Sequence, residues 1–217
     1  MSRRLFNNMT KKTIQLLHFE SNMNDESGNT KNASLYSSNN FSYVTGKFGQ
    51  CLYLQNSSAP CKNYIDTGIV LGGGDFTVEL WISVKSYVTM NKNAIILDFG
   101  GSNTQAGVLA LNSSGTYVCF YAQGNKLNVA TTINGWTHIA IVRKQGVIYV
   151  FINGVLLGSF SSTYNFTENL YIGYNRNSGM SNSYSEFLYG YIDELRISNI
   201  ARWTSSFTVP SAPYTAD

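Results

Sequence analysis

Paired carboxylates are the side chains of this sequence with the clearest catalytic chemistry, because two of them can share acid, base and nucleophile roles in glycoside hydrolysis. Asp75 and Glu79 fall on one face of an expected strand, and four residues of strand separate them by about 13 Å. Retaining hydrolases need about 5.5 Å and inverting hydrolases about 6.5–9.5 Å. Asp193 and Glu194 are adjacent and are expected to point to opposite faces of their strand. The sequence therefore predicts a protein that is not an enzyme.

Histidine and cysteine add little further chemistry. His18 and His138 are the only two histidines, and both fall in apolar strand patterns, which favours structural roles. No G-x-S-x-G or H-E-x-x-H motif occurs. Cys51, Cys61 and Cys119 are expected to be small buried hydrophobic residues, and a disulfide between Cys51 and Cys61 stays open.

The composition describes an aromatic-rich chain with few charges. Only 12% of the 217 residues are charged, the formal net charge is +3, and there are 15 Tyr and 12 Phe. This composition disfavours a coiled coil and charge-driven disorder, and the scattered basic residues indicate no nucleic-acid partner. No apolar run approaches the roughly 18 residues of a membrane span, so no membrane insertion is expected. The N-terminal segment lacks the apolar stretch and cleavage site of a signal peptide.

Short apolar segments separated by Gly, Asn and Ser clusters predict a sandwich or barrel of β-strands. Asn153-Gly154, between two apolar runs, predicts a tight hairpin turn. Val147–Ile152 is apolar on both faces and is expected to be buried from both sides. A short helical turn is expected only at Asn199–Thr204. The expected strands are Thr13–Phe19, Cys51–Gln55, Tyr64–Ile69, Phe76–Val84, Ala94–Phe99, Val108–Asn112, Tyr117–Gln123, Leu127–Thr131, Trp136–Arg143, Val147–Ile152, Val155–Phe160, Leu170–Gly173 and Phe187–Ser198.

Several segments, taken together, resemble the motifs of laminin-G-like domains. They are the turn Gly46-Lys-Phe-Gly-Gln-Cys-Leu-Tyr-Leu54, the strand Phe76-Thr-Val-Glu-Leu-Trp-Ile82, the hairpin Gly135-Trp-Thr-His-Ile-Ala-Ile-Val-Arg143 with Val150-Phe-Ile-Asn-Gly154, and the closing strand Gly190-Tyr-Ile-Asp-Glu-Leu-Arg-Ile197. The resemblance covers nearly the whole chain. It implies an all-β, concanavalin A-like jelly roll of two curved antiparallel sheets. The E-x-D-x-x-E strand of the glucanases that share this fold is absent.

The same resemblance implies a structural Ca²⁺ between the first strand and the closing strand. The matching positions are Glu20 and Asp193, with backbone oxygens from the turn at Gly46. Calcium takes six to eight oxygen ligands, so two carboxylates with carbonyl groups and waters would suffice. The alternative is that Asp193 only caps or pairs at the start of its strand.

Sugar binding is the commonest activity that the resemblance implies. Sugars need aromatic faces and amide or carboxylate groups, which the loops Gly100–Gln105 and Tyr174–Tyr184 offer. The alternative is that Asn and Ser in these loops only keep a surface with few charges soluble. The candidate ligand-binding residues are Asn103, Gln105, Tyr174, Asn175, Arg176, Asn177, Asn182 and Tyr184.

The ending Ala201–Tyr214 resembles a segment common in phage tail and virion proteins. We therefore expect a lectin-like adhesion module of a virion, assembled in the host cytoplasm, that binds a glycan or cell-surface polysaccharide and other virion proteins as a homo-oligomer or array. A purely structural virion decoration or assembly protein is the main alternative, and an unusual glycosidase is the third. The expected organisation is a basic segment over residues 1–12, the jelly roll over 13–200 and an extended C-terminal tail over 201–217.

Overall fold

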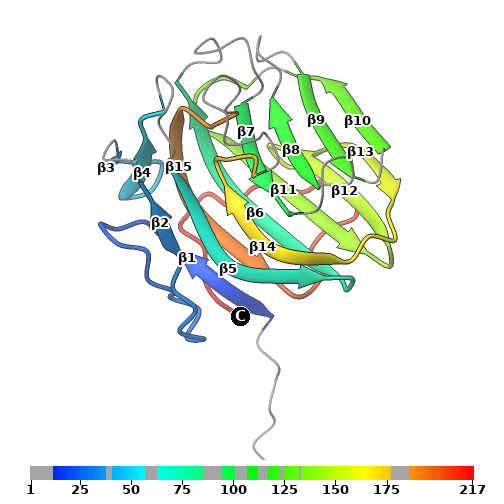
Figure 1. Cartoon of the computed structure of the whole chain (residues 1–217), viewed down its shortest axis with the longest axis horizontal. Helices are drawn as coiled ribbons and strands as arrows, with labels where there is room; N and C mark the ends of the chain where they lie inside the picture. The colour runs from blue at the N-terminus through cyan, green and yellow to red at the C-terminus, as the bar shows by residue number, and fades with distance from the viewer. Residues whose placement is uncertain are drawn as a thin grey trace, which may run out of the picture.

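Two antiparallel β-sheets lie face to face in the protein (Figure 1). The structure is a computed structural model that describes residues 12–37, 41–56, 63–85, 94–100, 107–111, 117–122, 125–131, 133–176 and 186–217. Sheet A has the order β13 (Val155–Ser161), β12 (Val147–Ile152), β11 (Thr137–Lys144), β6 (Phe76–Val84), β15 (Gly190–Ser198), β4 (Gln50–Leu54) and β3 (Phe41–Thr45), with β1 (Thr13–Leu17) also paired to β15. Sheet B has the order β10 (Asn125–Ala130), β9 (Tyr117–Ala122), β8 (Val108–Leu111), β7 (Ala94–Asp98), β14 (Phe166–Ile172), β5 (Tyr64–Gly72) and β2 (Ser34–Tyr36). The all-β sandwich that the sequence predicts is confirmed.

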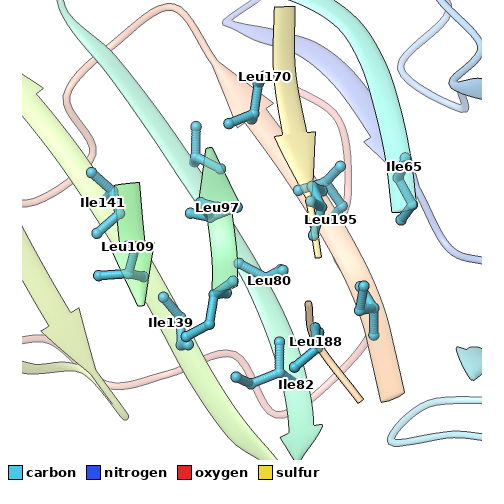
Figure 2. Packing of buried hydrophobic residues seen from close by; sticks show 14 of the residues in the cluster. Ile65, Leu80, Ile82, Leu97, Leu109, Ile139, Ile141, Leu170, Leu188 and Leu195 are labelled. Carbon is cyan, nitrogen blue, oxygen red and sulfur yellow. The ribbon is translucent and has the colours of Figure 1, made fainter. Parts of the chain in front are cut away.

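The core lies between the two sheets because alternate side chains of each strand point inward. Figure 2 shows the packing of buried aliphatic side chains that both sheets contribute. Sheet A contributes Leu80, Ile82, Ile139, Ile141 and Leu195, and sheet B contributes Ile65, Leu97, Leu109 and Leu170. This apolar interior leaves the outer faces of the sheets to carry the chemistry.

All thirteen expected strands are present, with shifts of a few residues at their ends. Two strands, β2 and β3, were not predicted, because they are short, lie at the sheet edges and contain no buried residue. The helical turn predicted at Asn199–Thr204 is wrong. The Thr77 hydroxyl donates to the Ile200 carbonyl at 2.7 Å and accepts from the Arg202 amide at 3.0 Å, so this backbone bonds to sheet A instead of to itself.

Ala201–Asp217, which we call the C-terminal strap, crosses the outer face of sheet A. In Figure 1 sheet B lies in front of sheet A, and the red strap runs behind both. Trp203 and Phe207 stack with ring centroids 3.7 Å apart and pack with Phe151 of β12, while Tyr214 is buried against Trp81 of β6. The strap therefore explains why β12 is apolar on its outer face as well as its inner face.

A buried carboxylate anchors the strap from below. Glu79 of β6 is fully buried and accepts hydrogen bonds from Arg196 at 2.8 Å. His138 Nε2 lies 3.2 Å from the other oxygen of Glu79, and Arg202 of the strap lies 3.7 Å from the first. Arg196 also donates to the Thr215 carbonyl at 3.1 Å. One charge cluster thus joins three strands of sheet A to the strap.

The turn between β12 and β13 and the burial of Cys51 agree with the sequence predictions. Asn153 and Gly154 have φ of 49° and 75°, as the turn between β12 and β13 requires. Cys51 is a free, fully buried thiol, as expected of a small hydrophobic residue. Cys61 lies outside the described residues.

Candidate functional site

The outer face of sheet B carries a set of tyrosine and polar side chains that strand alternation brings together. On β5, Tyr64 and Asp66 alternate with fully buried residues, and on β14 Asn169 and Tyr171 do the same. The register of β5 and β14 places Tyr171 opposite Asp66. Side chains about 105 residues apart in the chain therefore share one surface.

The rings form a continuous cluster centred on Tyr64. Its ring centroid lies 4.9 Å from that of Tyr36, 5.0 Å from that of Tyr171 and 4.9 Å from that of Tyr174. Tyr174 stacks in turn on Phe187 at 5.1 Å. We call these five residues the tyrosine cluster. Tyr36 is 54% exposed, so the cluster opens to solvent at this ring.

An arginine is held next to the cluster by a buried aspartate. The Arg176 guanidinium carbon lies 3.8 Å from the ring centroid of Tyr171. The carboxylate of Asp98, which is fully buried, accepts from the Arg176 backbone amide at 2.8 Å and from its Nε at 3.3 Å. Arg176 also donates to the Asn169 carbonyl. The guanidinium is therefore positioned before any ligand arrives.

The hydroxyls of Tyr64, Tyr171 and Tyr174 stay neutral over the physiological range, because their pKa values are raised. Burial, with help from neighbouring tyrosines and Asp66, raises the pKa of Tyr64 to about 12. Burial also raises the pKa of Tyr171 and of Tyr174. Neutral phenols both donate and accept hydrogen bonds, which is the capacity that sugar hydroxyls need from a partner.

The structure describes three of the eight predicted ligand-binding residues. Tyr174 and Arg176 join the tyrosine cluster, although Tyr174 is only 5% exposed and so supports Tyr64 from the side. Asn175 bonds instead to Glu186, through the Asn175 side chain at 2.7 Å. The others, Asn103, Gln105, Asn177, Asn182 and Tyr184, lie outside the described residues.

The sequence did not lead to Tyr36, Tyr64 and Tyr171 as site residues. A sequence pattern that points to Tyr64 and Tyr171 nevertheless exists. Tyr64-x-Asp66 and Asn169-x-Tyr171 both place an aromatic and a polar residue on one strand face. The pairing of β5 with β14, which makes one surface of them, carries no mark in the sequence.

The three predicted calcium ligands meet at the turn over residues 46–50. The carboxylate of Asp193 accepts from the backbone amides of Lys47 at 2.7 Å and Phe48 at 2.9 Å, and Glu20 accepts from the Gln50 amide at 3.0 Å. A Cβ at Gly46 would lie 2.6 Å from the Asp193 carboxylate, so only glycine fits there.

One carboxylate oxygen of Asp193, next to this turn, is available to a cation. Within the described part of the chain, Asp193 Oδ1 is buried and has no hydrogen-bond partner, and burial raises the pKa of this carboxyl to about 7. No group of three His, Cys, Asp or Glu gathers anywhere among the described residues. An ion here would thus take most of its ligands from carbonyl groups and water, as the sequence prediction assumed.

The carboxylates first considered for catalysis have structural partners. Asp75 accepts from the Gln145 amide at 2.7 Å, and Glu79 belongs to the charge cluster under the strap. A β-bulge between Asp193 and Arg196, with Glu194 at φ 50°, breaks the alternation assumed for that pair. Glu194 bonds His18 at 2.7 Å and the Tyr214 amide of the strap at 2.7 Å.

An apolar core between two antiparallel sheets, with aromatic and polar groups gathered on an outer face, defines a concanavalin A-like jelly-roll domain. The family model described as the concanavalin A-like lectin/glucanases superfamily, Laminin_G_3, matches residues 59–205. The chain belongs to this family. No curated protein matches the sequence.

Solved structures share the fold at low sequence identity. Domain 4 of AbnA, a GH43 extracellular arabinanase from Geobacillus stearothermophilus solved with arabinotriose, is 21% identical with a TM-score of 0.64, covering 88% of this chain and 94% of that one. A structure of botulinum neurotoxin type C, whose cell entry depends on interaction with two ganglioside molecules, is 14% identical with a TM-score of 0.62, covering 88% of this chain and 48% of that one. The binding domain of botulinum neurotoxin DC, solved with rat synaptotagmin II, is 15% identical with a TM-score of 0.62 and the same coverage. The chain thus spans about half the length of the toxin chains.

Among the described residues, no helix is long and apolar enough to cross a membrane.

Proposed function

We propose that the protein is a non-catalytic glycan-binding module that uses the tyrosine cluster and Arg176 on the outer face of sheet B. The observation that carries this proposal is Tyr64 in ring contact with Tyr36 and Tyr171, next to a guanidinium fixed on Tyr171. Aromatic side chains offer apolar surface with a polar tip, and a small number of placed polar groups fixes a ligand's orientation. The arabinanase domain with arabinotriose and the ganglioside-dependent toxin add support by analogy.

Replacing Tyr171 by alanine is expected to weaken glycan binding at least about tenfold, because the substitution removes a ring of the cluster and the support of Arg176. The measurement is a polysaccharide and glycan array with the purified protein presented multivalently, followed by titration of any ligand found. Phe41→Ala, an exposed aromatic residue of β3 in the other sheet, is the matched control. Equal binding by Tyr171→Ala and the control would contradict the site, and a blank array from folded protein would favour the purely structural alternative.

The proposed setting is a phage virion, supported by the resemblance of the ending Ala201–Tyr214 to tail and virion proteins. Shallow sites bind single sugars weakly, and display of many copies raises the overall affinity by avidity. The proposal therefore includes a homo-oligomer or array and contacts with other virion proteins. The loop residues Asn103, Gln105, Asn177, Asn182 and Tyr184, which lie outside the described residues, remain proposed as further ligand contacts. The division at residues 12 and 200 remains proposed as the domain organisation.

A structural Ca²⁺ at Glu20, Gly46 and Asp193 is part of the proposal, supported by the buried Asp193 Oδ1, which has no hydrogen-bond partner among the described residues. Calcium in excess is expected to raise the melting temperature and EDTA to lower it, because an ion that binds only the folded state stabilises that state. Thermal unfolding with and without Ca²⁺ measures the effect, and Mg²⁺ at the same concentration controls for ionic strength. Identical melting curves in Ca²⁺ and EDTA would remove the site.

A further inference from the structure

A second group of aromatic rings lies on the outer face of sheet A, whereas the tyrosine cluster lies on that of sheet B. Tyr53 of β4 and Tyr191 of β15 are direct partners in the strand register, and their rings stack at 4.6 Å. Tyr189 lies 6.0 Å from Tyr53, and Trp136 lies 6.3 Å from Tyr191. All four side chains are half-buried. The rings thus form one row across the strands.

A lysine ends the row and begins a chain of hydrogen bonds. Lys85 donates from its Nζ to the Tyr53 hydroxyl at 2.9 Å, and that hydroxyl donates to the Tyr189 hydroxyl at 3.1 Å. The backbone amide of Lys85 donates to the Tyr189 carbonyl at 3.0 Å, which fixes the lysine next to the row. Because each hydroxyl has one proton, the hydroxyl of Tyr189 keeps its own to donate. Within the described part of the chain, two N–H groups of Lys85 and this O–H are therefore donors without an acceptor.

The charge of Lys85 is not balanced by any described acidic side chain. Arg176, Arg196 and Arg202 each have a carboxylate within 4.0 Å, whereas Lys85 pairs with no carboxylate among the described residues. Its neighbours are the tyrosines: the Nζ lies 4.9 Å from the ring centroid of Tyr53 and 5.9 Å from that of Tyr189. The exposed ammonium group and the neighbouring hydroxyl are therefore complementary to an anionic oxygen.

We propose that Lys85, Tyr189, Tyr53, Tyr191 and Trp136 form a second glycan subsite that takes an acidic sugar residue. The carboxylate or sulfate group of the sugar accepts from Lys85 and Tyr189, and the sugar ring lies along the adjoining aromatic row. The class of ligand, a glycan, rests on the proposed function, while the location and the preference for an anion rest on sheet A alone. A chain with one site on each sheet can bridge two strands of a polysaccharide or hold one strand at two points.

Isothermal titration with three soluble probes tests this proposal. Oligogalacturonate carries carboxylates, dextran sulfate carries sulfate esters, and dextran is the neutral reference. We expect at least one acidic probe to bind about tenfold more tightly than dextran, and Lys85→Gln and Tyr189→Phe to remove most of that preference. Which acidic probe binds identifies the anionic group.

Two controls separate this subsite from general electrostatics and from the site on sheet B. Lys144→Gln removes the same charge from an exposed lysine of β11, and it is expected to leave the preference in place. An equal loss in Lys85→Gln and Lys144→Gln, or no preference for either acidic probe over dextran, overturns the subsite. Tyr171→Ala tests sheet B independently, because its ring makes no contact with the row on sheet A. Anion preference that survives in Tyr171→Ala supports the subsite whatever that variant does to binding of neutral glycans.

Discussion

Replacement of Glu79 by alanine is expected to lower the free energy of unfolding by about 3–5 kcal/mol, the cost of removing one partner from a buried ion pair. Two nitrogens of the Arg196 guanidinium lie 2.8 Å from the carboxylate of Glu79, which is fully buried. Nitrogens of His138 and Arg202 also lie within 4.0 Å of this carboxylate. Without the carboxylate, the Arg196 guanidinium stays beneath the strap with no carboxylate within 4.0 Å among the described residues. Chemical denaturation of the two proteins, with the midpoint and slope compared, measures the difference.

The control for this variant is an exposed glutamate that also pairs with an arginine. Glu168 lies 3.7 Å from Arg176, its side chain is 57% exposed, and Glu168→Ala is expected to cost at most about 1 kcal/mol. Similar losses for Glu79→Ala and Glu168→Ala would show that burial of Glu79 adds nothing to the worth of its ion pairs. Such a result would contradict the anchoring role assigned to the cluster.

Tyr214→Ala is expected to lower the free energy of unfolding by about 3–5 kcal/mol, because it removes the buried aromatic ring by which the strap packs on sheet A. Tyr214 is 3% exposed and packs with Leu16 and Trp81, and the Arg196 guanidinium carbon lies 4.8 Å from its ring centroid. Within the described part of the chain its hydroxyl is buried without a hydrogen bond. The buried hydroxyl therefore destabilises the folded state, whereas the ring stabilises it.

Tyr214→Phe separates these two contributions, since it keeps the ring and removes the hydroxyl. We expect this variant to be as stable as the parent or more stable. Thermal and urea unfolding of both variants measure the contrast. A loss of stability in Tyr214→Phe comparable to that in Tyr214→Ala would mean that the hydroxyl has a partner, such as a buried water, which the packing of the strap does not reveal.

The sequence predicts the strands well because the apolar segments and turns that define them are local features. The turn at Asn153-Gly154 is the clearest case, since both residues need a positive φ and both types tolerate it. The edge strands β2 and β3 could not be predicted in this way. They bury little apolar surface, so their pairing with β5 and β4 is a tertiary effect.

The candidate site was predicted only in part, for a physical reason of the same kind. Tyr174 and Arg176 drew attention because they begin a long polar loop, yet the rings that they contact belong to strands β5 and β14. Tyr64 and Tyr171 share a surface only because the jelly roll pairs strands that are distant in the chain. Loop composition indicated a ligand site, and sheet topology decides which side chains form it.

The contact between residues 12–13 and Asp217 has a mechanical consequence. The amides of Lys12 and Thr13 both donate to the Asp217 carbonyl, at 2.8 and 3.2 Å, and the Thr13 hydroxyl donates to the Asp217 carboxylate at 2.7 Å. A pulling force applied through residues 12 and 217 would therefore act between two neighbouring points at one edge of the sandwich. These few hydrogen bonds would bear the force first and would peel apart before the tension reached the strands that carry the tyrosine cluster.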